Sequence, residues 1–311
     1  MKNFNGIYAA TIVPMDQDGN INKIVLVDHL KEFSNIEGMT GLLINGHAGE
    51  NYILNKEEQI ELVKITRSVV SKETIVVSGL NFECSNTASE VAQQMVKNGA
   101  DSIMIFPPFS WALLNDEDLI FNHHNLIAKK IKSPIMLYQA SINAGLMAYN
   151  PATLKRLINI SEIVAIKEGS WETAKYDFNR RLTKRIRPEV AVMASGDEHL
   201  LSCFMIGSEG SLVSLAIIIP DAIIGLYKSI INKNFEEAIR YHNIIYPLAK
   251  AIYGTKPAGY ATARLKTCLK LIGKIPNDKM RNAMEPLNKV EIENLKKAIS
   301  SAGLITINNS N

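Results

Sequence analysis

The stretch Glu162-Ile-Val-Ala-Ile-Lys-Glu-Gly-Ser170 decides the fold, because it is a short apolar run that ends in Lys167 just before a turn. Such runs are typical of strands in a parallel sheet that is buried on both faces. A lysine in this place is expected to lose hydration, which lowers its pKa and frees a neutral amine to attack a carbonyl. The alternative is a lysine that reaches water or pairs with the carboxylate of Glu168.

Similar runs recur along the chain with helical patterns between them, and their starts lie roughly 20 to 35 residues apart, enough for a crossover helix each. The eight runs are Gly6 to Val13, Thr40 to Asn45, Thr74 to Gly79, Ser102 to Phe106, Pro134 to Tyr138, Ile163 to Lys167, Val190 to Ala194, and Gly210 to Leu215. Eight β/α units predict a closed TIM (β/α)8 barrel of the α/β class. An open doubly wound sheet is the alternative, but the chain lacks an early dinucleotide-type glycine turn.

The pattern changes after Pro220, where strand-like runs stop and helical segments follow, separated by breaks near Asn234, 254–257 and 273–276. We therefore predict two parts of the chain. Residues 1–220 form the barrel with the active site, and residues 221–311 form a helical extension packed on it, with residues 308–311 as a loose tail.

Composition limits the kinds of partner. The 311 residues carry a net charge of +3, and 47 % of them are hydrophobic, which allows a large core. Basic and acidic residues alternate, and the one basic stretch, 180–187, is interpreted as a solvated helix face rather than a nucleic-acid site. Cys84, Cys203 and Cys268 are isolated, which predicts free thiols in a reducing compartment. No apolar leader or membrane-length run is evident, so we expect a cytoplasmic protein with neither nucleic-acid nor membrane partners.

Polar groups follow several predicted strands at their carboxyl ends, where barrels of this type build their active sites. Lys167 and Tyr138 each end a strand, and the phenol of Tyr138 is suited to carry a proton. The loop Gly46-His-Ala-Gly-Glu50 ends a third, and its backbone N–H groups are suited to hold a carboxylate. The Gly196-Asp-Glu198 turn ends a fourth. Four such segments at one end of a barrel favour a catalytic lysine.

In these elements and their order, the sequence resembles the dihydrodipicolinate synthase / N-acetylneuraminate lyase family of class I aldolases and dehydratases. The resemblance runs from Gly6 to about Ile299 and rests on four motifs. They are Gly-x-x-Gly-Glu at 46–50, the strand-end Tyr138, Ile-Lys-Glu at 166–168, and Ser-Gly-Asp-Glu at 195–198.

The resemblance implies roles for these residues. Lys167 would form an imine with pyruvate or a related 2-oxo acid, and Tyr138 would move protons to and from the substrate. The backbone of Gly46 to Gly49 would bind the substrate carboxylate. The rim that binds substrate hydroxyls would include Gly196, Asp197, Glu198 and Ser214. The family needs no metal or organic cofactor, and it suggests a homo-oligomer, a tetramer or a dimer.

The chain departs from the family pattern at three places. The glycine loop carries His47 and Ala48 where two hydroxyl residues are common. Phe109 stands where dihydrodipicolinate synthases have a second tyrosine, and Asn143 replaces the arginine that holds the carboxylate of aspartate semialdehyde. These changes remove the apparatus of lysine biosynthesis and leave the imine-forming core.

Several aromatic and histidine residues allow two interpretations. Phe106, Phe109 and Trp111 form either an apolar wall for a less polar aldehyde or ordinary packing of a barrel loop. His47 either takes over acid–base work from the missing hydroxyls or is a structural residue. His123 and His124 are interpreted as surface or packing residues.

The leading hypothesis is a lyase that cleaves or dehydrates a 2-oxo acid, such as a 2-keto-3-deoxy sugar acid, through a Lys167 imine. One alternative is a 4-hydroxy-tetrahydrodipicolinate synthase with an altered proton relay. The other, from a different class, is a non-catalytic paralogue that binds a 2-oxo acid.

Overall fold

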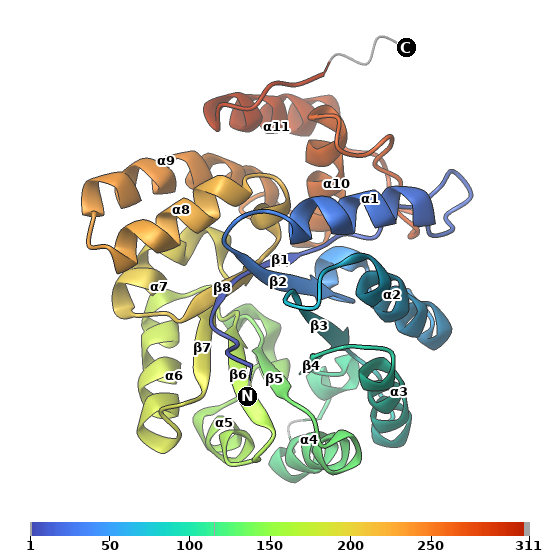
Figure 1. Ribbon diagram of the computed structural model, residues 1–311, viewed down its shortest axis with the longest axis vertical. Helices are drawn as coiled ribbons and strands as arrows, with labels where there is room; N and C mark the ends of the chain where they lie inside the picture. Colours follow the sequence, from blue (N-terminus) through green and yellow to red (C-terminus); the bar gives the residue numbers. More distant parts are fainter. Residues whose placement is uncertain (1, 115, 308–311) are drawn as a thin grey trace.

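Eight parallel strands form a closed barrel in the computed structural model, which describes residues 2–114 and 116–307 (Figure 1). Each strand pairs with the next along the chain, and β8 pairs with β1. The strands are β1 (Gly6–Ala10), β2 (Met39–Ile44), β3 (Ile75–Leu80), β4 (Ser102–Ile105), β5 (Ile135–Gln139), β6 (Ile163–Glu168), β7 (Ala191–Ala194) and β8 (Gly210–Val213). The predicted TIM barrel is confirmed, and the open sheet is wrong.

A helix follows each strand and covers the outside of the barrel. These helices are α1 (Lys23–Ser34), α2 (Lys56–Val69), α3 (Ser85–Lys97), α4 (Glu117–Ile131), α5 (Pro151–Ile158), α6 (Thr173–Ile186), α7 (Leu200–Ile206) and α8 (Pro220–Ile231). Their starts follow local rules. Asn55 and Glu58 form a capping box at α2, and Asn150 caps α5 with Pro151 in its first turn.

The strands divide the apolar side chains between two cores because successive side chains point to opposite faces. One core lies between strands and helices and includes Leu42, Val76 and Ile166. The other fills the barrel with Tyr8, Met104, Phe106, Met136 and further side chains, and Tyr138 packs against it. The Tyr8 phenol donates a hydrogen bond to the carbonyl of Phe4 at 2.9 Å. Tyr8 thereby anchors the segment that enters β1.

Three further helices complete the chain: α9 (Phe235–Ile252), α10 (Ala261–Leu271) and α11 (Lys289–Ser301). Helix α9 packs on α8, and α11 packs on α9 and α10, so the three gather on one side of the barrel (Figure 1). This confirms the predicted C-terminal helices. The division at residue 220 stays a prediction, and α8, the helix of the eighth β/α unit, lies on its C-terminal side. The predicted loose tail at 308–311 lies outside the described residues.

A buried ion pair connects these helices to the barrel. Lys266 on α10 pairs with Glu50 in the loop after β2, and both side chains are at most 1 % exposed. The Lys266 ammonium also donates to the carbonyl of Lys279 at 2.9 Å. The other oxygen of Glu50 accepts the N–H of Arg281 at 3.1 Å. The extension therefore fixes the predicted carboxylate-binding loop.

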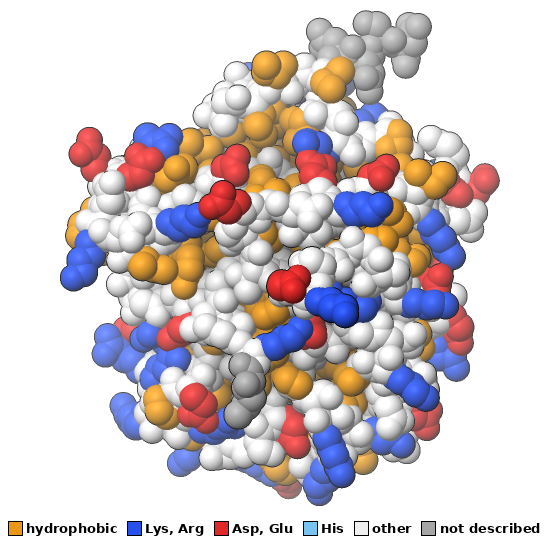
Figure 2. All heavy atoms as spheres, in the orientation of Figure 1, with side chains coloured by type: hydrophobic (Ala, Val, Ile, Leu, Met, Phe, Trp, Pro, Cys, Tyr) orange, Lys and Arg blue, Asp and Glu red, His pale blue; other side chains and the backbone are white. Residues whose placement is uncertain are grey.

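The outer surface mixes the two signs of charge, and blue and red side chains intermingle on the face in Figure 2. Several basic residues of the 180–187 stretch pair with carboxylates, as Arg180 and Lys184 do with Glu209. Within the described ranges, no helix is both long and apolar enough to cross a membrane.

Candidate active site

Lys167 and Tyr138 are directly paired residues of neighbouring strands β6 and β5. Both share a strand face with side chains of the barrel interior, Ala165 and Met136. The Lys167 ammonium nitrogen lies 5.5 Å from the centroid of the Tyr138 ring. The structure thus brings together the two residues that the sequence placed at separate strand ends.

The surroundings of Lys167 favour the neutral amine. Burial lowers its pKa to about 8, although the charge of nearby Asp197 acts in the opposite direction. Among the described residues, no carboxylate lies within ion-pair distance of its nitrogen. A lysine with this pKa has a substantial fraction of free amine near neutral pH, as a carbonyl nucleophile requires.

Glu168 does not pair with Lys167, because neighbouring residues of a strand point to opposite faces. Its carboxylate accepts hydrogen bonds from the Asn179 amide at 2.7 Å and the Ser170 hydroxyl at 2.8 Å. Burial raises its pKa. The alternative interpretation of Lys167 as an ion-pair partner of Glu168 is therefore wrong, and Glu168 instead holds the turn after β6.

Gly169 allows the Tyr138 ring to lie close to that turn. A Cβ atom at Gly169 would stand 2.9 Å from the Gln139 carbonyl and 3.4 Å from the Tyr138 hydroxyl. The contact with the Gln139 carbonyl is too short to form without a shift of the backbone, whereas the Tyr138 hydroxyl would stand at an ordinary contact distance. The glycine after Lys-Glu is thus a site feature that we did not single out in the sequence.

The glycine loop forms a single 3-10 turn, His47–Gly49, closed by a hydrogen bond from the Gly49 N–H to the Gly46 carbonyl at 3.0 Å. The N–H of Asn51 donates to the same carbonyl at 3.3 Å. Within the described part of the chain, the N–H groups of His47 and Ala48 have no acceptor. This turn therefore presents free donors of the kind that bind a carboxylate.

His47 lies against the interior aromatic residues. Its ring centroid is 4.4 Å from that of Phe106 and 5.5 Å from that of Tyr138. The side chain is exposed, yet the surrounding protein atoms and the charge of Lys167 lower its pKa to about 4. Water on the exposed side works against this fall. Whether its pKa lies near 4 or closer to the ordinary histidine value of about 6.5, the imidazole is mostly neutral at pH 7, so it can accept a proton there.

The four predicted rim residues divide into buried and accessible groups. Gly196 and Asp197 are buried, and an Asp197 oxygen accepts the N–H of Leu215 at 3.1 Å. Burial raises the Asp197 pKa to about 7. Glu198 and Ser214 are half-buried, so these two side chains remain accessible to a ligand.

The other predicted residues differ in their placement. Trp111 is buried and packs against His123 and His124, so it is a packing residue. Phe109 is 52 % exposed, and its N–H donates to Glu83 at 2.9 Å. Asn143 is exposed on the 3-10 segment Ile142–Met147. Within the described chain, no hydrogen bond or ring pair joins Phe109 or Asn143 to Lys167 or Tyr138.

Two aromatic residues at the same end of the barrel were missed. Trp171 follows β6, and Tyr253 follows α9; their ring centroids lie 5.1 Å apart. The Tyr253 hydroxyl donates to that of Ser214 at 2.8 Å. The position of Trp171 four residues after Lys167 was a usable signal. Tyr253 gave none, because it is distant in sequence.

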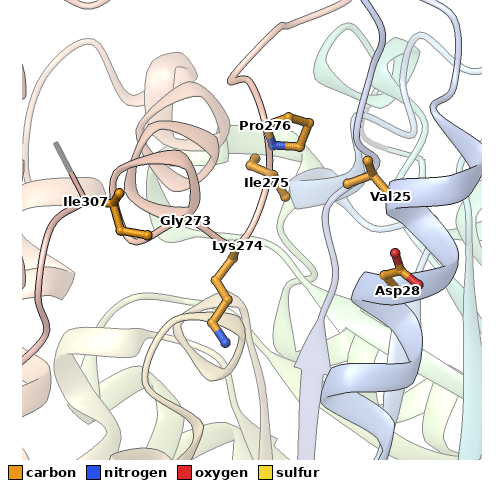
Figure 3. Close-up of a pocket in the computed structure, with 7 residues that line it drawn as sticks. All are labelled: Val25, Asp28, Gly273, Lys274, Ile275, Pro276 and Ile307. Carbon is orange, nitrogen blue, oxygen red and sulfur yellow. The ribbon is translucent and has the colours of Figure 1, made fainter. Parts of the chain in front are cut away.

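A cavity of about 400 Å³ lies elsewhere, between α1 and the segment after α10 (Figure 3). Val25 and Asp28 of α1 face Gly273 to Pro276 there, and none of the predicted site residues lines it. Across residues 2–114 and 116–307, no three His, Cys, Asp or Glu side chains are grouped to hold a metal ion.

The model of the dihydrodipicolinate synthetase family matches residues 3–302 of the chain. The chain belongs to this family. Accordingly, it is a class I, pyruvate-dependent lyase or aldolase that works through a Schiff base.

The curated relatives of this family member are distant, and the matches cover most of each chain. It is 25 % identical to the 4-hydroxy-tetrahydrodipicolinate synthase of Kosmotoga olearia, over 97 % of this chain and 99 % of the relative. It is 29 % identical to an uncharacterised DapA-like lyase of Thermococcus kodakarensis, over 79 % of this chain and 82 % of the relative.

Solved structures of the family show the same fold. The dihydrodipicolinate synthase of Thermotoga maritima superposes with a TM-score of 0.87 at 21 % identity, covering 98 % of this chain and 100 % of the other. The prophage protein YagE of Escherichia coli K12, solved in complex with pyruvate, superposes with a TM-score of 0.87 at 22 % identity, covering 97 % and 100 %.

The amine of Lys167 is predicted to titrate near pH 8, below the ordinary lysine value of about 10.4. Below pH 8 the protonated, unreactive form predominates, and the fraction of free amine increases as the pH rises through 8. Brief acetylation at a series of pH values, with mass spectrometry of the Lys167 peptide, measures the midpoint against a peptide with one lysine. Asp197→Asn should lower the midpoint and Asp28→Asn should not. A midpoint near 10 would contradict the prediction.

Proposed function

We propose that Lys167 forms an imine with pyruvate or a related 2-oxo acid and that the enzyme cleaves or dehydrates a 2-oxo acid, such as a 2-keto-3-deoxy sugar acid. The observation that carries this proposal is an amine of lowered pKa beside the Tyr138 phenol, above an otherwise apolar interior. Removing water from an ammonium favours its neutral form, which is the nucleophile.

Once the imine exists, the protein needs to supply only groups that donate and accept protons. The amine adds to the C2 carbonyl and one water leaves. The positive imine then draws electrons from the substrate. In cleavage, the C4 hydroxyl loses its proton, the C3–C4 bond breaks, and an aldehyde leaves. The enamine takes a proton at C3, and water hydrolyses the imine. In dehydration, C3 loses the proton and the C4 hydroxyl leaves as water.

Tyr138 is proposed as the group that carries these protons, since its ring is adjacent to Lys167. Burial raises the pKa of its phenol to about 12, so the hydroxyl stays protonated and able to donate. The free N–H groups of the Gly46 to Gly49 turn are proposed to hold the substrate carboxylate. Glu198 and Ser214 are proposed to contact hydroxyl groups of the substrate. The charge of Asp197 is proposed to raise the Lys167 pKa, against the effect of burial.

Reduction with borohydride in the presence of pyruvate is expected to add one pyruvate-derived mass to Lys167, because the free amine there is the best nucleophile in the barrel. Peptide mass spectrometry locates the adduct. Lys167→Ala should abolish it, whereas Lys175→Ala, on the outer helix α6, should leave it. An adduct on another lysine, with Lys167 unmodified, would contradict the proposed mechanism.

His47→Ala is expected to lower kcat by roughly 10²- to 10⁴-fold, the scale of general acid–base catalysis, while pyruvate trapping continues. The reason is that a neutral imidazole next to Tyr138 can accept its proton. Because the His47 pKa is lowered, the acid limb of the kcat profile should fall well below pH 6.5, towards pH 4, and disappear in the variant. His242→Ala on α9 is the control. Unchanged turnover and pH profile would make His47 structural.

The runner-up function is a 4-hydroxy-tetrahydrodipicolinate synthase with an altered proton relay, the activity named for the Kosmotoga relative. Against it stand Ala48, Phe109 and Asn143, none of which supplies the hydroxyl, phenol or guanidinium of those enzymes. Purified protein is therefore expected to condense pyruvate with aspartate semialdehyde negligibly, and its gene to fail in rescuing a lysine auxotroph. Robust rescue would favour the runner-up.

The sequence also suggested a non-catalytic 2-oxo-acid-binding protein as the alternative from another class, and membership of a lyase family stands against it. Such a protein would form the imine with a 2-oxo acid but would not convert the acid into a product. Assaying a panel of 2-oxo acids after a positive trapping experiment separates this binder from an enzyme. The free thiols of Cys84, Cys203 and Cys268 support a cytoplasmic, reducing location for either.

We further propose a homo-oligomer, a dimer or tetramer, joined through an exposed apolar patch in the loops that follow β4 and β5. The patch comprises Phe109, Leu113, Leu114, Ile142 and Leu146, on two short segments that pack together. Sedimentation velocity is expected to find an oligomer that Leu113→Asp with Leu146→Asp dissociates, whereas Ile231→Asp on α8 does not. A monomeric native protein would refute this.

A further inference from the structure

Trp171, four residues after Lys167, occupies a strained backbone position. Its φ of +60° is in the left-handed region, which is unusual for a bulky residue. Ser170 holds the turn, since its hydroxyl donates to Glu168 and to the carbonyl of Glu172 at 3.2 Å. Strain of this kind persists only where surrounding contacts determine it, and it is common at functional sites.

Tyr253 completes an aromatic pair from outside the barrel. It lies directly after α9, and its ring packs on that of Trp171. Its hydroxyl is bonded to Ser214, which follows β8. Burial raises the Tyr253 pKa, and the charge of Asp197, which also acts on Lys167, adds to this rise. Both rings remain half-buried and so keep an accessible surface.

Glu198 lies on the turn Asp197–His199, which packs against α9, the helix that ends just before Tyr253, and its carboxylate has an incomplete set of contacts. One carboxylate oxygen is 3.8 Å from the His199 ring, and the other is 3.8 Å from the Lys250 ammonium. The second oxygen is buried, and among the described residues it has no hydrogen-bond donor. A buried acceptor without a donor is costly, so a donor on a ligand would be favoured there.

From these contacts we propose that Trp171 and Tyr253 form the subsite for the distal part of the substrate, and that it takes an uncharged group with an apolar face and a hydroxyl. The rings pack against the apolar face, and the Glu198 oxygen accepts the hydroxyl. A distal carboxylate is disfavoured because it would meet the buried Glu198 oxygen, which is itself an acceptor that lacks a donor among the described residues. This inference rests on the proposed lyase function and names the class of aldehyde that it releases or joins.

Two sources share this chemistry, a sugar-derived chain and a hydroxylated aromatic ring. The test is condensation of pyruvate with glyceraldehyde, with 2-hydroxybenzaldehyde and with glyoxylate, measured as kcat/KM for the aldehyde at saturating pyruvate. In each, the C3 enamine carbon bonds to the aldehyde carbon, whose oxygen takes a proton. Glyoxylate is charged and too short to reach the ring pair.

Trp171→Ala is expected to lower kcat/KM for at least one of the two uncharged aldehydes about tenfold relative to glyoxylate, since an aromatic contact contributes on this scale beyond its area. The aldehyde that responds identifies the source. Tyr253→Phe keeps the ring contact and should retain most of the rate, unlike Tyr253→Ala. Phe178→Ala and Tyr246→Ala, exposed aromatic residues of α6 and α9, are the controls.

Equal losses for all three aldehydes, or no loss for any, would overturn the subsite. If no aldehyde condenses, the borohydride-reduced pyruvate adduct is titrated with both uncharged aldehydes. Quenching of tryptophan fluorescence that Trp171→Phe removes supports the proposal, and its absence refutes it. Failure of pyruvate trapping in the native protein would instead contradict the proposed lyase function. Failure of the subsite and failure of the proposed function are therefore distinguishable.

Discussion

The buried ion pair between Glu50 and Lys266 is the constraint on which the site depends. Two charges taken out of water cost several kcal/mol each, and their attraction offsets this only with good geometry and further hydrogen bonds. Both conditions hold, because Lys279 and Arg281 supply backbone partners. The pair fixes the turn that ends in Gly49, and with it the free N–H groups, to a helix more than two hundred residues later. Barrel and extension are thus one physical unit at this end.

The interior of the barrel then determines what Lys167 is. Apolar side chains below it withhold water, and Asp197 restores only part of the lost stabilisation of the ammonium. The same desolvation acts oppositely on the acid, raising the Asp197 pKa to about 7. The pKa values of lysine and aspartate consequently both lie near neutrality, although the two side chains ordinarily titrate more than six pH units apart, at about 10.4 and about 3.9. Position within the barrel, rather than residue type, produces this similarity.

The sequence predicted the features that depend on local pattern. The apolar runs show where strands end, and so where Lys167 and Tyr138 lie. The regular spacing of these runs predicts the eight β/α units. The sequence could not predict features that depend on distant packing. Trp111 and Trp171 each follow a strand in a short loop, yet one is buried among histidines and the other meets Tyr253. Which of the two tryptophans meets Tyr253 depends on where α9 ends, because Tyr253 directly follows that helix. The hydrogen bond between Asp197 and Leu215 was likewise invisible in sequence.

The end of α9 has a consequence for how such an enzyme can diverge. Tyr253 touches the site, but its helix contributes nothing to the closed sheet, and Lys167 is held by strands that do not depend on it. Changes in the length or packing of α9 can therefore reposition the phenol ring while the nucleophile stays in place. Lineages with this architecture have a route to new metabolic roles that leaves the chemical step intact, because the element that selects and the element that reacts are encoded by separate segments.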